Sequence, residues 1–393
     1  MANIVLNNAF GESVTYEGVN QILLKNTSGD YVPFSQAEEK HNGKYVVTVV
    51  DYDGTILKQD FLNTGDSFTL PDFPIHDGIV AREWVCPIDI VNNKITIGYS
   101  DVTCGISYAT STGLTEVDIE LTKATGLTIN FKMDGTKDWG DGTSNTETSH
   151  TYSNYGSYTI ICDGTTMPSF QSTDGLFGQP SYSAQKTSAN FVCKNIRWGD
   201  NVVVSGGAVN RCYSMETMTF PNSVEFGINN FYFNQSLKAI AVPTSVLARI
   251  AFGVDLWNDT SLEYVAIGKS TTKDQNNNYR GCSSLKTVFL DDIITYTGAE
   301  WFSSCKSLKN IYFPSGLNEI SNNGSAIISG TNFRILDFSR CSQVVVLPSS
   351  NRITGINQLT KIVVPDALYD SWITATNWSS LANYIYKASE IYE

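Results

Sequence analysis

Hydrophobic residues recur at a fixed spacing through the second half of the chain. From about residue 190, an apolar residue is followed three and five positions later by two more, and this triplet occurs eight times at steps of 22 to 26 residues. The triplets are Cys193/Ile196/Trp198, Met215/Met218/Phe220, Leu237/Ile240/Val242, Leu262/Val265/Ile267, Leu285/Val288/Leu290, Leu308/Ile311/Phe313, Phe333/Leu336/Phe338 and Leu359/Ile362/Val364. Side chains alternate between the two faces of a strand. The pattern therefore predicts one short strand per repeat, with the +3 and +5 residues in a continuous core.

The turns of this repeat share further residues. Residues 282–288 and 305–311 both read Cys-x-Ser-Leu-Lys followed by a variable residue and Val or Ile. A proline follows the predicted strand in four of the repeats, at Pro221, Pro243, Pro314 and Pro365, where its missing N–H does little harm. These features resemble the BspA-type leucine-rich repeat. The resemblance implies a solenoid over residues 166–365.

The end of the chain has the pattern of a cap. Residues 365–372 begin with Pro-Asp, a helix start, and residues 377–385 repeat apolar residues at helical spacing. The two segments resemble the C-terminal end of BspA-like proteins. We expect a short helical cap over residues 366–393 that shields the last open turn.

The first half of the chain has the period of strands. Residues 45–50 form a β-branched run, and the Asp53-Gly54 pair that follows is a hairpin signal. The spacing of Asp51, Asp53 and Gly54 also mimics the start of a calcium loop, but Asp60 stands where such a loop has its glutamate. A hairpin is therefore the preferred interpretation. Together with a Gly-Asp turn and a terminal tryptophan at Trp84, the segment resembles a bacterial B-repeat module, which we place at residues 43–112.

Residues 113–165 alternate apolar and polar residues in several short runs. Trp-Gly-Asp-Gly-Thr at 139–143, His-Thr-Tyr at 150–152 and Gly-Ser-Tyr-Thr-Ile at 156–160 follow in order. This triple resembles the PKD-like immunoglobulin-type sandwich, in which the tryptophan and the last tyrosine pack in the core. His150 and Asp141 could be imagined with a serine as a catalytic triad. No nucleophile elbow accompanies them, so a histidine beside a turn is preferred.

The predicted fold class is mainly β: small N-terminal β modules that include an Ig/PKD-like sandwich, then a leucine-rich-repeat solenoid with a short helical C-terminal cap. Residues 1–42 precede the modules, with two short alternating runs around residues 21–25 and 31–34 and a polar stretch after them. We expect short strands and a linker there, which form a docking arm.

Charge and rare residues narrow the function. The chain has 26 Lys and Arg against 39 Asp and Glu, a net charge of −13, which disfavours binding to nucleic acid. It has only three histidines, and no pair of its eight cysteines has the Cys-x-x-Cys spacing of zinc or redox sites. We expect no metal and no cofactor, and all eight cysteines buried as reduced thiols.

The three resemblances are to adhesive surface modules, and none is to an enzyme family. The N-terminus reads as no secretory signal and no apolar run is long enough to span a membrane. We therefore expect a non-enzymatic protein on the surface of a bacteriophage virion, such as a tail fibre, receptor-binding or head-decoration component, made in the host cytoplasm and released by lysis. Its partners would be other virion proteins and a host glycan or protein, with self-association as an open alternative.

Two other functions stay open. An exported bacterial cell-surface adhesin is the first. A glycan-cleaving tail spike is the second, and it would need two carboxylates about 5–10 Å apart.

The candidate ligand contacts lie on the outward face of the predicted repeat strands, at positions +2 and +4. In the middle repeats this face carries Tyr264, Phe289 and Tyr312 with Thr287 and Asn310. Exposed neighbouring rings beside amide and hydroxyl groups suit a sugar or protein ligand. The alternative is that another subunit or a neighbouring module covers this face.

Overall fold

The chain forms two compact units, residues 1–43 and 44–393. The structure is a computed structural model, and it describes residues 2–7, 13–19, 23–25, 31–33, 44–122, 126–168, 191–205, 209–227, 231–247, 256–269, 279–292, 294, 296–297, 301–320, 326–329, 333–358 and 360–392. In the first unit β1 (Ala2–Asn7) pairs with β2 (Ser13–Val19), and β3 (Leu23–Lys25) pairs with β4 (Tyr31–Pro33), both antiparallel. The linker expected near residues 36–43 lies outside the described residues.

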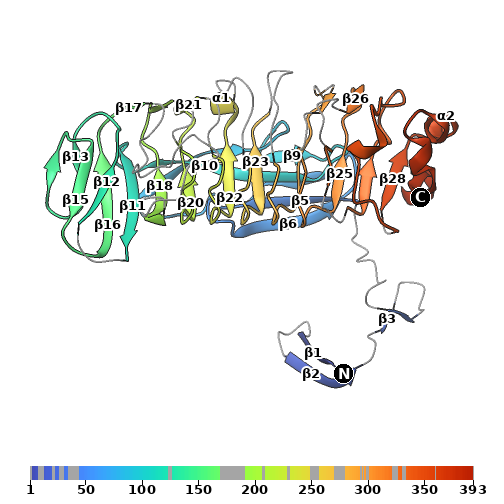
Figure 1. The fold of residues 1–393 in the computed structure, drawn as a ribbon, viewed down its shortest axis with the longest axis horizontal. Coiled ribbons are helices and arrows are strands. Elements are labelled where there is room, and N and C mark those ends of the chain that lie inside the picture. Colours follow the sequence, from blue (N-terminus) through green and yellow to red (C-terminus); the bar gives the residue numbers. More distant parts are fainter. Residues whose placement is uncertain are drawn as a thin grey trace. The chain divides into compact units, whose positions relative to one another are not determined.

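A row of short strands runs through the second unit, one from most repeats (Figure 1). The row consists of β18 (Cys193–Arg197), β20 (Thr217–Thr219), β22 (Ala239–Val242), β23 (Tyr264–Ile267), β25 (Asn310–Tyr312), β27 (Ile335–Asp337) and β28 (Lys361–Val364). Neighbours that pair do so in parallel, for example Asn195 with Thr217 and Ile335 with Lys361. A second line of parallel bridges joins β17 (Thr166–Met167), β19 (Val203–Val204) and β21 (Glu225–Phe226), and another joins β24 (Tyr296–Thr297) to β26 (Glu319–Ile320).

The apolar triplets fill the interior of this row, as the period predicted. All of their described members are buried except Ile267, which is half-buried and packs against the same core. Leu359 lies outside the described residues. One hydrophobic cluster extends from Val117 to Ile385, so each repeat adds a layer to a continuous core.

The segment after residue 113 begins this row instead of forming a separate body. Its strands are β11 (Thr115–Leu121), β12 (Leu127–Asn130), β13 (Lys137–Asp138), β14 (Ser144–Asn145), β15 (Ser149–Tyr152) and β16 (Gly156–Cys162). In the sheet ordered β14-β13-β16-β11-β18-β20, β11 pairs with the first repeat strand, and Ile119 lies opposite Cys193. Trp139, fully buried, belongs to the same core cluster as the repeats. The boundary expected near residue 165 therefore does not divide the core.

The C-terminal segment contains short helices next to the last repeat strand. It contains η4 (Asp366–Leu368), α2 (Tyr369–Thr374), η5 (Ser379–Tyr384) and α3 (Ala388–Tyr392), and it also adds the parallel strand β29 (Ile385–Lys387) next to β28. Trp372 and Trp378 are both fully buried with their rings 5.5 Å apart. The indole N–H of Trp378 donates to the carbonyl of Val345, which anchors the cap to the preceding repeat. The part of the chain that the structure describes has two further short helices, α1 (Thr244–Leu247) and η3 (Ser350–Arg352). Within the described residues no helix meets the length and hydropathy needed to cross a bilayer.

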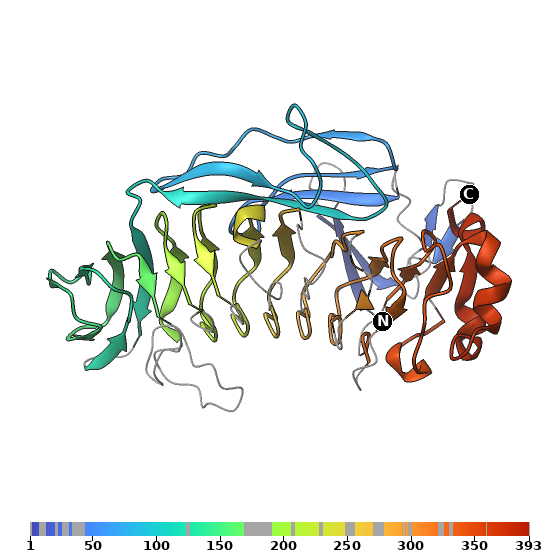
Figure 2. The same cartoon turned by 90° about the horizontal axis from the view of Figure 1, so that it is seen from above.

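Residues 44–110 form a β module that lies beside the repeats (Figure 2). Its strands are β5 (Tyr45–Val50), β6 (Ile56–Leu62), β7 (Ser67–Thr69), β8 (Ile79–Val85), β9 (Lys94–Thr96) and β10 (Val102–Thr110). Four of them make a sheet in the order β6-β5-β10-β8, and β7 pairs with β9. The hairpin predicted at Asp53-Gly54 is confirmed: β5 and β6 are antiparallel, and Gly54 has φ of +88°. The residues that resemble the B-repeat end at Trp84, in β8. The sheet also needs β10, which lies between β5 and β8, so the module extends beyond that tryptophan.

The prediction of eight reduced cysteines is wrong for two of them. Cys86 and Cys104 form a disulfide, because β8 and β10 are antiparallel neighbours and place the two side chains opposite each other. The other six are buried free thiols, at Cys162, Cys193, Cys212, Cys282, Cys305 and Cys341. The spacing of 18 residues between the paired cysteines carries no signal without the register of β8 against β10.

Candidate binding surfaces

Strand β10 covers the outward face of the repeat strands. The Thr103 and Thr287 hydroxyl oxygens are 2.7 Å apart, and the Ser107 hydroxyl donates to the carbonyl of Phe220 at 3.1 Å. Between these two contacts, Gly105 lies so close to the repeats that a Cβ atom there would be 2.9 Å from the Cβ atoms of both Ala241 and Ala266. Every residue of β10 is buried, since its other face packs inside the module.

These contacts give the direction of β10. From Ser107 to Thr103 the strand advances four residues, about 13 Å at 3.3 Å per residue. Over the same length its contacts move from the second repeat, at Phe220, to the fifth, at Thr287. Three strand spacings of about 4.8 Å are about 14 Å. Because the two lengths agree, β10 must run along the axis of the row, at right angles to the repeat strands.

The expected exposed aromatic face is therefore wrong, and the alternative of a covering module describes the structure. Tyr264, Thr287 and Tyr312 are only 8%, 7% and 3% exposed. Tyr264 packs with Val50 and Ala239, and the Tyr312 ring lies 5.0 Å from that of Tyr45.

Phe289 and Asn310 complete the predicted set. Phe289 is half-buried against the core of the module, and Asn310 is half-buried on β25. Tyr264, Thr287, Phe289 and Tyr312 thus lie along one covered seam between the repeats and the module.

Small residues in the sequence mark this seam, although the large aromatic residues at other outward positions draw more attention. Outward positions of the third and fourth repeats carry Ala239, Ala241 and Ala266, three small residues on a face that polar residues usually occupy. Gly105 stands inside a strand, where glycine often marks the close approach of another backbone. Small residues on both sides allow the two sheets to approach closely.

Filling that close contact should loosen the module. We expect Gly105→Val to lower the free energy of unfolding by about 1–3 kcal/mol, because its side chain must displace Ala241 and Ala266. Chemical denaturation followed by tryptophan fluorescence measures the change. Gly98→Val is the matched control, since nothing lies within 4 Å of a Cβ built at Gly98. Equal losses in the two variants would contradict tight packing at the seam.

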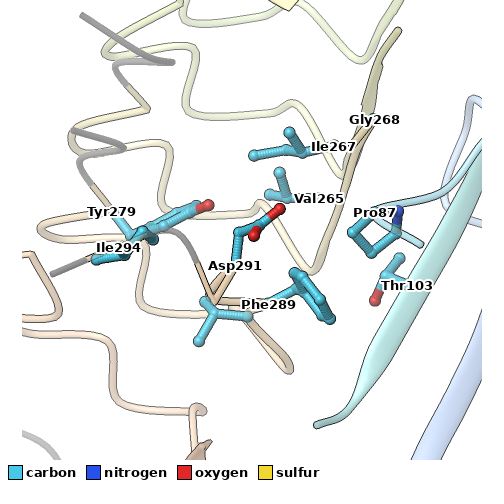
Figure 3. A pocket seen from close by; sticks show the side chains of 10 residues that line it. Pro87, Thr103, Val265, Ile267, Gly268, Tyr279, Phe289, Asp291 and Ile294 are labelled. Carbon is cyan, nitrogen blue, oxygen red and sulfur yellow. The ribbon is translucent and has the colours of Figure 1, made fainter. Parts of the chain in front are cut away.

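A pocket opens where the module meets the middle repeats (Figure 3). It encloses about 520 Å³, counted to its open side, between Pro87 and Thr103 of the module and Val265, Ile267 and Phe289 of the repeats. The remaining lining residues are Gly268, Tyr279, Val288, Asp291 and Ile294. The lining is mostly apolar, and Asp291 is its only carboxylate among the described residues. The pocket is thus a gap in the packing of the seam with one polar wall.

A second, wider hollow lies at the C-terminal end of the seam. We call it the Tyr99 groove; it encloses about 700 Å³ counted to its open side. Its lining residues are Lys44, Tyr45, Asn63, Thr64, Tyr99, Ser339, Arg340 and Ala388. Tyr99 is 50% exposed. The sequence carries no signal for this tyrosine, because Gly98-Tyr99-Ser100-Asp101 has the pattern of an ordinary turn.

Asp101, directly beyond that turn, is a buried acid. It is 5% exposed and accepts a hydrogen bond from the backbone N–H of Val46 at 3.0 Å. Burial raises the pKa of Asp101 to about 7, although the Val46 hydrogen bond and the charge of Lys44 act to lower it. An acid with a raised pKa in the folded state binds a proton that the unfolded state has lost, so stability decreases as pH rises between the two pKa values.

This acid should make stability depend on pH. We expect the free energy of unfolding to fall by about 2 kcal/mol between pH 5 and pH 6.5 on account of Asp101, at up to about 1.4 kcal/mol per pH unit. Asp101→Asn should remove this slope and keep the Val46 hydrogen bond. Urea titrations at several pH values measure it. The same slope in the variant and in the parent chain would show that Asp101 is not the group responsible.

The two described histidines each pair with an aspartate. His150 contacts Asp141 at 2.7 Å and stacks on the Trp139 ring at 5.0 Å. His76 contacts Asp51 at 2.7 Å, and the Tyr108 hydroxyl donates to the same carboxylate. The contacts of His150 agree with the interpretation of a histidine beside a turn. Over the described residues, no cluster of three or more His, Cys, Asp or Glu is arranged to hold a metal ion.

Comparison with known proteins identifies the repeats. Residues 203–326 match the family described as BspA type Leucine rich repeat region, in six copies. Among curated proteins, none matches the chain. A solved structure with similarity to it is a leucine-rich repeat protein from Bacteroides ovatus, at 21% sequence identity and a TM-score of 0.33. That match covers 49% of this chain and 54% of the other, so the chain spans about half the length of that protein. The repeats at residues 203–326 are therefore a BspA-type leucine-rich-repeat region.

Proposed function

We propose that this protein is a non-enzymatic adhesive protein of a bacteriophage virion surface, a tail-fibre, receptor-binding or head-decoration component that attaches to a host surface. The observation that carries the proposal is the BspA-type repeat region, a class of module built for extended contact surfaces. The PKD-like and B-repeat-like resemblances of residues 113–165 and 43–112 support the same class. In this proposal residues 1–42 attach the chain to the particle.

The continuous core supports a mechanical role in attachment. A single cluster from Val117 to Ile385, with a tryptophan-rich cap at its C-terminal end, gives a stiff body that can hold a binding face away from its base. Stiff bodies lose little conformational entropy when they bind. Adhesion by such a body needs polar and aromatic groups that are exposed on its surface, and it needs no conformational change.

The experiment has two parts. Mass spectrometry of purified particles should detect the chain if it is a virion component, and beads coated with the purified protein should retain host cells. Absence from particles together with a pool in the culture medium would overturn the virion placement. Failure of the coated beads to retain any cells would overturn adhesion itself.

An exported bacterial adhesin is the second candidate, and the disulfide favours it. Cys86 and Cys104 are joined in the module, and stable disulfides form mainly in oxidising compartments outside the cytoplasm. Mass mapping of the native protein without reduction would find the two peptides linked. Their recovery as free thiols from cells would argue against export.

A further inference from the structure

The Tyr99 groove has the composition of a sugar site. Its aromatic ring is half exposed, and the side chains of Asn63, Thr64 and Ser339 line the same hollow. Amide and hydroxyl groups both donate and accept hydrogen bonds, as sugar hydroxyls do. The hollow is open to solvent and measures about 700 Å³ counted to its open side.

Arg340 fixes the orientation of the Tyr99 ring. Its guanidinium carbon lies 5.0 Å from the ring centroid, so one face of the ring is occupied. The guanidinium is itself held by two hydrogen bonds to Asp292, at 2.9 and 2.7 Å. Burial acts to raise the pKa of Asp292, but hydrogen bonds from Arg340 and Ser315 hold it below its usual value. The half-exposed ring is therefore already held in place for a ligand.

The charges around the groove are paired. Arg340 is neutralised by Asp292, and the ammonium of Lys44 lies 3.4 Å from the Asp337 carboxylate. Both cations among the described residues that line the groove are therefore paired, and the net charge of −13 repels anions. These electrostatics favour a neutral ligand over an acidic sugar or an acidic peptide.

We propose that the Tyr99 groove binds a neutral oligosaccharide, with one sugar ring stacked on Tyr99. The apolar C–H face of the sugar packs on the tyrosine ring, and its hydroxyls bond to Asn63 and Ser339. Arg340 is a positioning residue that keeps the tyrosine in place. The proposal rests on the proposed function, because it names the class of ligand through which the protein adheres.

The test compares tyrosines at two sites on a glycan array that carries neutral and acidic oligosaccharides. Tyr99→Ala should weaken binding to the neutral glycans by at least about tenfold, whereas Tyr99→Phe should retain it because the ring remains. Asn63→Ala should weaken it less. Tyr155→Ala is the matched control, since Tyr155 is 69% exposed and lies outside the groove; it should bind as the parent chain does. Thermal melting of each variant confirms that the fold is kept.

Three results would overturn the proposal: no binding to any neutral glycan, equal binding by the Tyr99→Ala variant, or a preference for acidic glycans. Retention of host cells on protein-coated beads distinguishes a wrong assignment of the groove from a wrong assignment of adhesion. If the parent chain and Tyr99→Ala retain cells equally, adhesion stands and another surface carries it. If neither retains cells, adhesion itself is wrong.

Discussion

A Leu308→Asp chain is expected to lose the repeat region as a cooperative unit. Leu308 has no exposed surface and lies in the core cluster between its neighbouring repeats. A carboxylate there has no cation to pair with among the apolar side chains of that cluster, and a buried unpaired charge costs several kcal/mol. We expect a loss of about 5 kcal/mol or more, which exceeds what most single substitutions cause.

Circular dichroism during urea denaturation measures this loss. Lys306→Asp is the matched control, since it places the same residue two positions away at an exposed site of the same turn. It should change stability by less than about 0.5 kcal/mol. A Leu308→Asp variant that melts like this control would show that the position does not face the core.

Removing the Trp139 side chain should weaken both its own segment and the first repeats. Trp139 is fully buried and its indole N–H donates to Asn145. Trp139→Ala should cost about 3–5 kcal/mol through the cavity it leaves. Because β11 pairs with β18, the loss should reach the neighbouring repeat strand and then fade along the row.

Hydrogen exchange followed by mass spectrometry resolves the direction of that loss. Protection should drop in β18 and β20 and stay near its original level in β28. Trp372→Ala gives the reciprocal control, since Trp372 is equally buried at the opposite end and should expose β28 first. If Trp139→Ala left β18 fully protected, residues 113–165 would be an independent domain after all.

The periodic half of the fold could be predicted because its signal is local and repeated. Leu285, Leu308 and Leu336 each occupy a slot that the triplet pattern identifies, and each is fully buried. The helical cap could be located for a similar reason, since Pro365 and Asp366 mark its start. In both cases a residue packs mainly against residues that are close to it in the sequence, so a local pattern is enough to predict its burial.

The binding face could not be predicted, because exposure depends on a partner far away in the chain. Tyr312 has the outward register of an exposed residue, yet Tyr45, 267 positions earlier, packs on it. Residues 102–108 alternate apolar residues with polar or small ones, the pattern of a strand with one face in solvent, yet every residue of the strand is buried. The Tyr99 groove combines residues 63–64, 99 and 339–340, which no local pattern brings together.

The course of β10 has a consequence for how the second unit responds to force. A strand is nearly fully extended, at about 3.3 Å per residue, so it cannot lengthen when the row is bent. Strand β10 lies across the second to fifth repeats and contacts them at both ends, so it fixes the spacing of these repeats on one side. Bending is therefore confined to the repeats beyond its ends. A pull along the row would leave the second to fifth repeats at their original spacing, and the repeats beyond β10 would take up the deformation.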